Sequence, residues 1–118
     1  MSYELFITKA DYSWEIEDSP IQEAEWLEVA NKCAELKISM NDCYSRKGDD
    51  GQIENYHPWL ITSLPDNPPL WFIDGAINTT NPDIKTIKFM VNLAKRLDAK
   101  VIGEDGETYD ESGEAFHT

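Results

Sequence analysis

The sequence predicts a single α+β domain, in which a largely antiparallel sheet carries two helices packed on one face. Segments with strand patterning precede, separate and follow two amphipathic helical segments, an order that is typical of this class. An Asp-Gly pair between two apolar runs, at residues 74–75, indicates a tight antiparallel hairpin. The 118 residues suit one domain covering 1–118, and no internal repeat is visible.

The first strand and the first helix are expected near the N-terminus. Residues 3–9 are rich in aromatic and β-branched side chains, with apolar residues at alternate positions, and therefore predict a strand. The helix is expected over 19–36, because Ser19 suits the N-cap, Pro20 suits the first helical position and Gln22 completes a capping box. Its apolar residues recur at helical spacing, so one side should face the sheet.

The middle of the chain gives weaker signals. Residues 37–40 are compatible with a short strand, and 59–62 predict another after a proline. The conformation of 41–57 stays open between a long hairpin and a loop, because its glycines and charged residues favour turns without specifying pairing. The prolines of 65–69 predict a rigid turn.

The second half has the clearest local pattern. Leu70 and Phe72 should face the same side of the hairpin as Ile77, since strand side chains alternate. Asn81-Pro82-Asp83 has the cap, proline and acid of a helix start. The buried stripe of that helix should comprise Ile84, Ile87, Met90, Val91, Ala94 and Leu97. A strand is expected over 99–102, followed by an acidic C-terminal tail from about residue 103.

The opposite side of the second helix carries Lys85, Lys88 and Lys95. We interpret these lysines as a solvated face, since late basic residues complement the helix dipole. The alternative is that they hold one of the chain's own acidic segments or an acidic partner.

The negative charge is concentrated in two segments. The chain has 23 acidic and 10 basic residues, for a formal net charge of -13. Seven acids lie within 11–28 and six within 103–114, and neither segment contains Lys or Arg. This balance argues against nucleic acid or an anionic membrane as a partner, because both need clustered basic residues. It favours a basic protein partner.

The N-terminal residues lack the basic and apolar regions of a secretory signal, and no apolar run is long enough to span a bilayer. Cys33 and Cys43 have neither metal-ligand nor CxxC spacing. We interpret both as reduced thiols in a cytoplasmic protein, with a disulfide between them as the alternative.

No motif in the chain predicts catalysis, a metal or a cofactor. His57 and Cys43 can form a reactive pair only if the fold brings them together, and a strand-edge histidine is the favoured interpretation. The two acidic Asp-Gly turns, at 49–51 and 104–107, do not have the ligand register of an EF-hand loop. The predicted set of catalytic residues, metal ligands and cofactors is therefore empty.

Two or three of the four tryptophans should be core residues in a domain of this size. Trp14 is the best candidate for exposure, because it lies among acids and outside any periodic pattern, and in that position it can anchor a basic partner. Packing of Trp14 back over the sheet is the slightly favoured interpretation.

Four stretches of the chain carry a family resemblance: residues 1–8, 70–77, 81–83 and 94–110. Together they resemble small acidic bacterial immunity proteins of polymorphic toxin and contact-dependent growth inhibition systems, over about half of the chain. The resemblance implies a protein that binds and neutralises the cytotoxic domain of a cognate toxin. It transfers no catalytic residue and no contact residue, because members of such systems contact their partners differently.

We therefore expect a non-enzymatic acidic binding protein, most concretely an immunity protein for a cognate toxin domain that acts as a nuclease. The residues expected to bind the partner come from both acidic segments: Asp11, Trp14, Glu15, Glu17, Asp18, Glu104, Asp105, Glu107, Tyr109 and Asp110. One alternative is an adaptor or regulatory interaction module that uses a sheet edge or the basic helix. Another is a small enzyme or metal protein centred on His57 and Cys43. The oligomeric state is not predicted.

Overall fold

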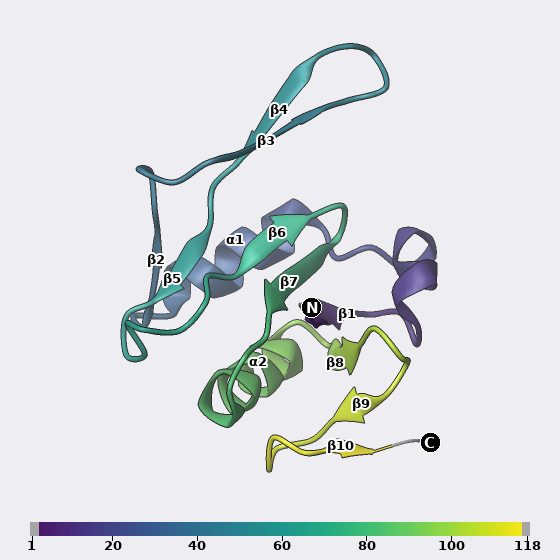
Figure 1. Ribbon diagram of the computed structural model, residues 1–118, viewed down its shortest axis with the longest axis vertical. Helices are drawn as coiled ribbons and strands as arrows, with labels where there is room; N and C mark the ends of the chain where they lie inside the picture. The colour runs from purple at the N-terminus through teal and green to yellow at the C-terminus, as the bar shows by residue number, and fades with distance from the viewer. Residues whose placement is uncertain (1–2, 117–118) are drawn as a thin grey trace.

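A computed structural model describes residues 3–116 and confirms the α+β class (Figure 1). The strands are β1 (Glu4–Thr8), β2 (Leu36–Ile38), β3 (Tyr44–Lys47), β4 (Ile53–Tyr56), β5 (Trp59–Ile61), β6 (Trp71–Ile73), β7 (Ala76–Thr80), β8 (Lys100–Gly103), β9 (Thr108–Tyr109) and β10 (Ala115–Phe116). The helices are the 3-10 helix η1 (Ser13–Asp18), α1 (Glu23–Lys32) and α2 (Ile84–Arg96). A six-stranded sheet has the order β10-β9-β8-β1-β7-β6, and two further sheets pair β2 with β5 and β3 with β4.

The core lies between the six-stranded sheet and the two helices. All strand pairs are antiparallel, and Ile7 in the middle of the sheet lies opposite both Ile77 and Val101. Trp26 of α1 and Met90 of α2 are fully buried in the same apolar cluster as these three residues. Both helices therefore cover one face of the sheet, as predicted.

The predicted hairpin at residues 74–75 is confirmed. Asp74 and Gly75 have φ values of 54° and 89°, the left-handed pair that a two-residue hairpin turn requires. Gly75 is needed for a second reason, because a Cβ there would lie 2.6 Å from the Cβ of Pro20. Phe72 lies opposite Ile77 in the register, so their side chains share a face as expected.

The first helix is shorter than the predicted 19–36. It begins after Gln22, which forms a capping box with Glu25, so the prediction of Ser19 as the cap is wrong. The chain before it stays extended because the N–H of Ile21 donates to a carbonyl of the β6–β7 turn at 2.8 Å, and Ile21 itself is buried. The predicted C-terminal residues of the helix instead lead into β2.

The second helix begins at its Asp83 cap rather than at Asn81. The Asp83 carboxylate accepts the N–H of Thr86 at 2.8 Å, and this hydrogen bond lowers the pKa of Asp83. Asn81 has a φ of 49°, and its side-chain oxygen accepts the N–H of Tyr3. Five of the six residues of the predicted stripe are buried, and Ile84, in the first turn, is 57% exposed. Thr86 and Leu93 are also buried, which was not predicted.

The acidic C-terminal segment extends the sheet instead of ending as a tail. Its strands β9 and β10 pair with each other, and β9 pairs with β8. Glu111 in the connecting turn forms an ion pair with Lys95, and Gly113 packs against Ile84. The basic side of α2 therefore holds one of the chain's own acidic segments at Lys95, while Lys85 and Lys88 are exposed.

Residues 41–57 form the β3–β4 hairpin, which Figure 1 shows projecting away from the rest of the fold. Within the part of the chain that the structure describes, no helix has both the length and the apolar composition needed to cross a membrane.

Candidate functional site

The two acidic segments meet at one edge of the molecule. Asp11, just before η1, forms an ion pair with Lys100 at the start of β8. Gly106, in the turn between β8 and β9, lies so close to Tyr12 that a Cβ there would be 3.1 Å from the tyrosine ring. Figure 1 shows η1 beside this turn. Tertiary structure therefore joins residues that are about ninety positions apart in the sequence.

An exposed aromatic pair marks this junction. The rings of Tyr12 and Trp14 are stacked, with centroids 4.7 Å apart and planes 8° from parallel. Trp14 is 70% exposed and Tyr12 is 44% exposed, so the interpretation in which Trp14 packs back over the sheet is wrong. Trp26 and Trp59 are buried, as expected for core tryptophans. We call the surface formed by Asp11, Tyr12, Trp14, Glu104 and Asp105 the acidic–aromatic face.

The carboxylates of this face are exposed. Glu104 accepts the N–H of Glu4 at 3.1 Å, which holds the turn against β1. Asp105 has no ion-pair partner among residues 3–116. On η1, Glu17 and Asp18 are exposed and Glu15 is half-buried. The face therefore combines a flat aromatic surface with exposed carboxylates, of which Asp11 is paired with Lys100 and Asp105 has no ion-pair partner within the described range.

Glu107 lies beneath this face and not on it. Its side chain is only 5% exposed, and the same carboxylate oxygen accepts the hydroxyls of Tyr3 and Tyr109. Burial, followed by the bond to Glu107, raises the pKa of Tyr109 to about 12, and the pKa of Tyr3 is raised for the same reasons. A Cβ on Gly103 would collide with the carboxylate. This Glu107 cluster (Tyr3, Gly103, Glu107 and Tyr109) closes the sheet edge, so its carboxylate is not available to a partner.

Asp110, the last of the predicted binding residues, belongs to the β9–β10 turn. Its carboxylate accepts the backbone N–H and the hydroxyl of Ser112, and these hydrogen bonds lower the pKa of Asp110. The neighbouring Glu111 is paired with Lys95. The second acidic segment is therefore divided, and Glu104 and Asp105 belong to the part whose turn lies against Tyr12 at Gly106.

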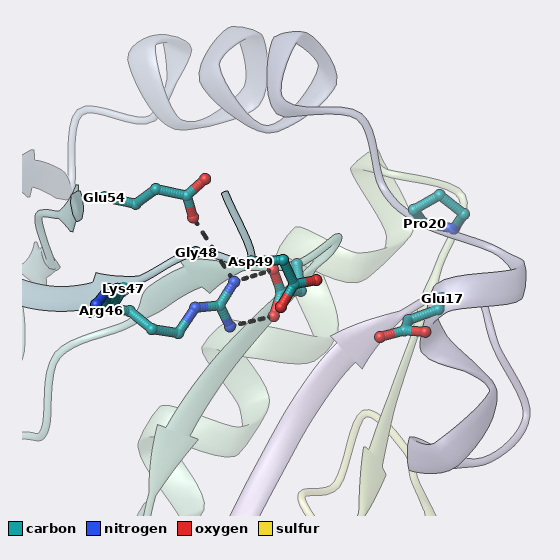
Figure 2. A pocket seen from close by; sticks show the side chains of 8 residues that line it. Glu17, Pro20, Arg46, Lys47, Gly48, Asp49 and Glu54 are labelled. Carbon is teal, nitrogen blue, oxygen red and sulfur yellow. Dashed lines mark hydrogen bonds and ion pairs between the residues drawn. The ribbon is translucent and has the colours of Figure 1, made fainter. Parts of the chain in front are cut away.

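A polar cleft of about 650 Å³ lies between the β3–β4 hairpin and the body of the protein. Two nitrogens of the Arg46 guanidinium donate to the Asp74 carboxylate at 2.6 and 2.8 Å, and Glu54 is 3.7 Å away. The hydrogen bonds from Arg46 lower the pKa of Asp74. Figure 2 shows Glu17 and Pro20 on the other side of the cleft.

The sequence did not point to this cleft. Arg46 and Asp74 are 28 residues apart, and Arg46 lies in the segment whose conformation was open. An isolated basic residue in a charged turn carries no signal for a distant partner. The bidentate geometry does indicate that Arg46 fastens the hairpin to the β6–β7 turn.

The chemistry considered for His57 and Cys43 has no support in the observed contacts. Nδ1 of His57 lies 2.9 Å from the backbone oxygen of Asp42, and the sulfur of Cys43 lies 3.9 Å from the hydroxyl of Ser45. Cys33 and Cys43 are both free thiols, so the disulfide alternative is wrong. Within residues 3–116, no three His, Cys, Asp or Glu side chains are grouped so that they can hold a metal ion.

No protein-family model, curated protein or solved structure matches the chain.

Proposed function

We propose that this protein is a non-enzymatic binding protein whose basic protein partner docks on the acidic–aromatic face. The observation that carries the proposal is the stacked, exposed pair of Tyr12 and Trp14 at the junction of both acidic segments. Tyrosine and tryptophan are the residues most enriched among those that dominate binding energy at protein interfaces.

The surrounding charge gives the face its preference for a basic partner. Asp11, Glu104 and Asp105 are exposed in the two segments that meet at Tyr12 and Gly106, and Asp11 pairs with Lys100. Exposed carboxylates of one sign accelerate association with a basic surface and disfavour acidic partners. The aromatic pair would then slow dissociation by burying its rings.

The most concrete form of the proposal is a cytoplasmic immunity protein that neutralises a cognate nuclease toxin domain. Its support is the family resemblance of the sequence together with charge complementarity. A nuclease must bind phosphates in a basic cleft, so an inhibitor gains from carboxylates placed where the phosphates would lie. Exposed carboxylates beside an aromatic anchor are suited to that task.

The deciding experiment is titration of the protein with the toxin domain encoded beside its gene. Nanomolar binding is expected, and Trp14→Ala should weaken it about 30-fold or more, as for an interface residue that dominates binding. Met40→Ala is the matched control, because Met40 is a similarly exposed apolar residue, at 67%, between β2 and β3. Absence of a toxin gene in the neighbourhood would remove the immunity assignment.

A second set of variants tests the charges separately. Reversal of Asp11, Glu104 and Asp105 to Lys should slow association steeply and reduce its dependence on salt. Reversal of the exposed Glu35 and Asp66, elsewhere on the surface, is the control and should change the association rate little. Nanomolar binding that survives the first set would contradict the role of the acidic–aromatic face.

One observation favours a different kind of interaction module as a second candidate. Among the strands described in residues 3–116, β3 and β4 pair with each other and with no other strand, and the hairpin exposes Tyr44 and Ile53. Isolated two-stranded hairpins are marginally stable in water, so a partner that adds to this sheet would stabilise it. A dimer in light scattering that Ile53→Lys converts to a monomer would support this candidate.

A further inference from the structure

A second cleft, of about 380 Å³, opens between α1 and the base of the β3–β4 hairpin. Six of its lining residues are aromatic or aliphatic: Trp26, Leu27, Ile38, Tyr56, Trp59 and Phe72. The other lining residues are Glu23, Glu54, Asn55 and His57, and no Lys or Arg of residues 3–116 lines the cleft. The cleft is therefore mainly apolar and contains two carboxylates.

The aromatic wall of the cleft consists of two packed tryptophans, one of which has a hydrogen-bond donor without an acceptor in the described part of the chain. Trp26 and Trp59 are buried and meet edge to face, with centroids 5.9 Å apart and planes at 85°. Among residues 3–116, the Nε1–H of Trp26 is the buried side-chain polar atom that lacks a hydrogen-bond partner. Leu27 and Ile38 are 37% and 43% exposed where the cleft meets solvent. The Trp26 N–H is a donor, so the backbone carbonyl of an occupant, and not a guanidinium, would satisfy it. An aliphatic chain on the occupant would cover Leu27 and Ile38.

Two carboxylates give the cleft its charge. Glu23 is exposed in the first turn of α1 and has no ion-pair partner within the described range 3–116. Glu54 accepts the hydroxyl of Tyr56 at 2.6 Å and lies 3.7 Å from Arg46. Glu23 therefore supplies the uncompensated charge.

One contact within the protein already places a guanidinium over an aromatic ring beside a carboxylate. The guanidinium carbon of Arg46 lies 5.7 Å from the centre of the Tyr56 ring, beside Glu54. Guanidinium groups stack on aromatic rings and are weakly hydrated, so they suit a site of aromatic walls and carboxylates better than an ammonium group does.

We propose that this cleft binds an arginine side chain of the basic protein partner, an inference that rests on the proposed function. The aliphatic stem would lie against Tyr56 and Phe72, the half-buried aromatic residues of the cleft, above the buried Trp26 and Trp59. The guanidinium would lie toward Glu23. The cleft and the acidic–aromatic face are then two separate contact points, with the cleft selecting arginine and the face contributing the aromatic anchor.

The test uses the intact protein and a small probe, N-acetyl-L-arginine amide, titrated while the tryptophan indole N–H signals are followed by NMR. Signals of Trp26 and Trp59 should shift with a dissociation constant of about 1 mM, the range reached by a ligand of this size. The neutral isostere N-acetyl-L-citrulline amide should bind at least about fivefold more weakly, because it lacks the charge.

Variants locate the binding. Glu23→Gln should weaken the arginine probe about two- to fivefold, as for a solvent-accessible ion pair. Glu28→Gln is the control, since Glu28 is also exposed on α1, where it pairs with Lys32, and does not line the cleft. The proposal is overturned if the citrulline probe binds as tightly as arginine, if Glu28→Gln has the same effect as Glu23→Gln, or if the Trp26 and Trp59 signals do not move.

The outcome is separable from the proposed function. Trp14→Ala should leave binding of the arginine probe unchanged, because Trp14 does not line the cleft. A probe that binds normally to a protein without a toxin partner would retain the cleft and remove the immunity assignment. If a toxin binds through Trp14 but the cleft does not bind the arginine probe, the proposed function is retained and the arginine-binding proposal is removed.

Discussion

The acidic–aromatic face and the Glu107 cluster both take carboxylates from the short stretch 104–107, but these carboxylates lie in opposite environments. Glu104 and Asp105 are exposed to water, whereas Glu107 is buried under them against two tyrosine hydroxyls. Carboxylates that accept hydrogen bonds from buried donors stabilise the fold, whereas solvent-exposed carboxylates are available to a partner. Substitutions within this small region should separate stability from binding.

Gly103→Ala should have the largest effect. The added Cβ would collide with the Glu107 carboxylate and approach the hydroxyl of Tyr3 to 2.6 Å. Overpacking of this kind costs about 3 kcal/mol of the free energy of unfolding, measurable by urea denaturation. Gly51→Ala is the control: it has the unfavourable φ of 83° but open space around it, so it should cost about 1 kcal/mol.

Glu107→Ala should be destabilising by about 2 kcal/mol, because it leaves the hydroxyls of Tyr3 and Tyr109 without their acceptor. Glu104→Ala, three residues earlier, should change the free energy of unfolding by about 0.5 kcal/mol or less. Thermal unfolding of the two variants checks the difference. Equal effects would mean that the two carboxylates have similar environments, contrary to the structure.

Alkaline pH should weaken the cluster. Folding raises the pKa of Tyr109 from about 10 to about 12, and the protonated form is neutral. Its contribution to stability is therefore fully present below about pH 10 and is lost as the pH rises toward 12. Tyr109→Phe should reduce the loss between pH 9 and 11 by about 1 kcal/mol, measured by urea unfolding. Tyr12→Phe, at an exposed position, should follow the wild-type curve.

The smallest effect is expected at Asp74, where a carboxylate is paired but half-exposed. Arg46 lowers its pKa, so the contribution of the pair is present above the ordinary Asp value near 4 and is lost as the pH falls through the lowered value. Asp74→Asn should speed hydrogen exchange of the β3–β4 amides a few-fold while leaving β1 unchanged. Glu28→Gln, which breaks the exposed pair with Lys32, should leave the hairpin amides at wild-type rates.

Local rules explain which elements could be predicted. The turn at Asp74-Gly75 follows from the φ values that two residues must adopt, and the α2 stripe follows from helical spacing. The start of α1 could not be found in this way, because the Ser19-Pro20 signal is overridden by a bond between Ile21 and a turn over fifty residues away. Long-range contacts outweigh a local cap when they also bury an apolar side chain.

The candidate site was predicted only in part. The acidic segments could be inferred, since they are visible as a local absence of basic residues. Trp14 is the best candidate for exposure among the tryptophans, but the favoured interpretation packs it over the sheet, and its 70% exposure shows that this interpretation is wrong. The stacking on Tyr12, the loss of Glu107 from the surface and the cleft beside Glu23 depend on tertiary contacts. No local feature distinguishes Glu107 from Glu104.

The sequence by itself determined the α+β class, the central hairpin, the second helix and the amount and location of the negative charge. These properties depend on residues within a few positions of one another, through backbone conformation and periodicity. Tertiary structure decided which carboxylates are exposed and that the two acidic segments meet. That decision depends on partners such as Tyr3 and Glu107, 104 residues apart, which only the packed sheet brings within bonding distance.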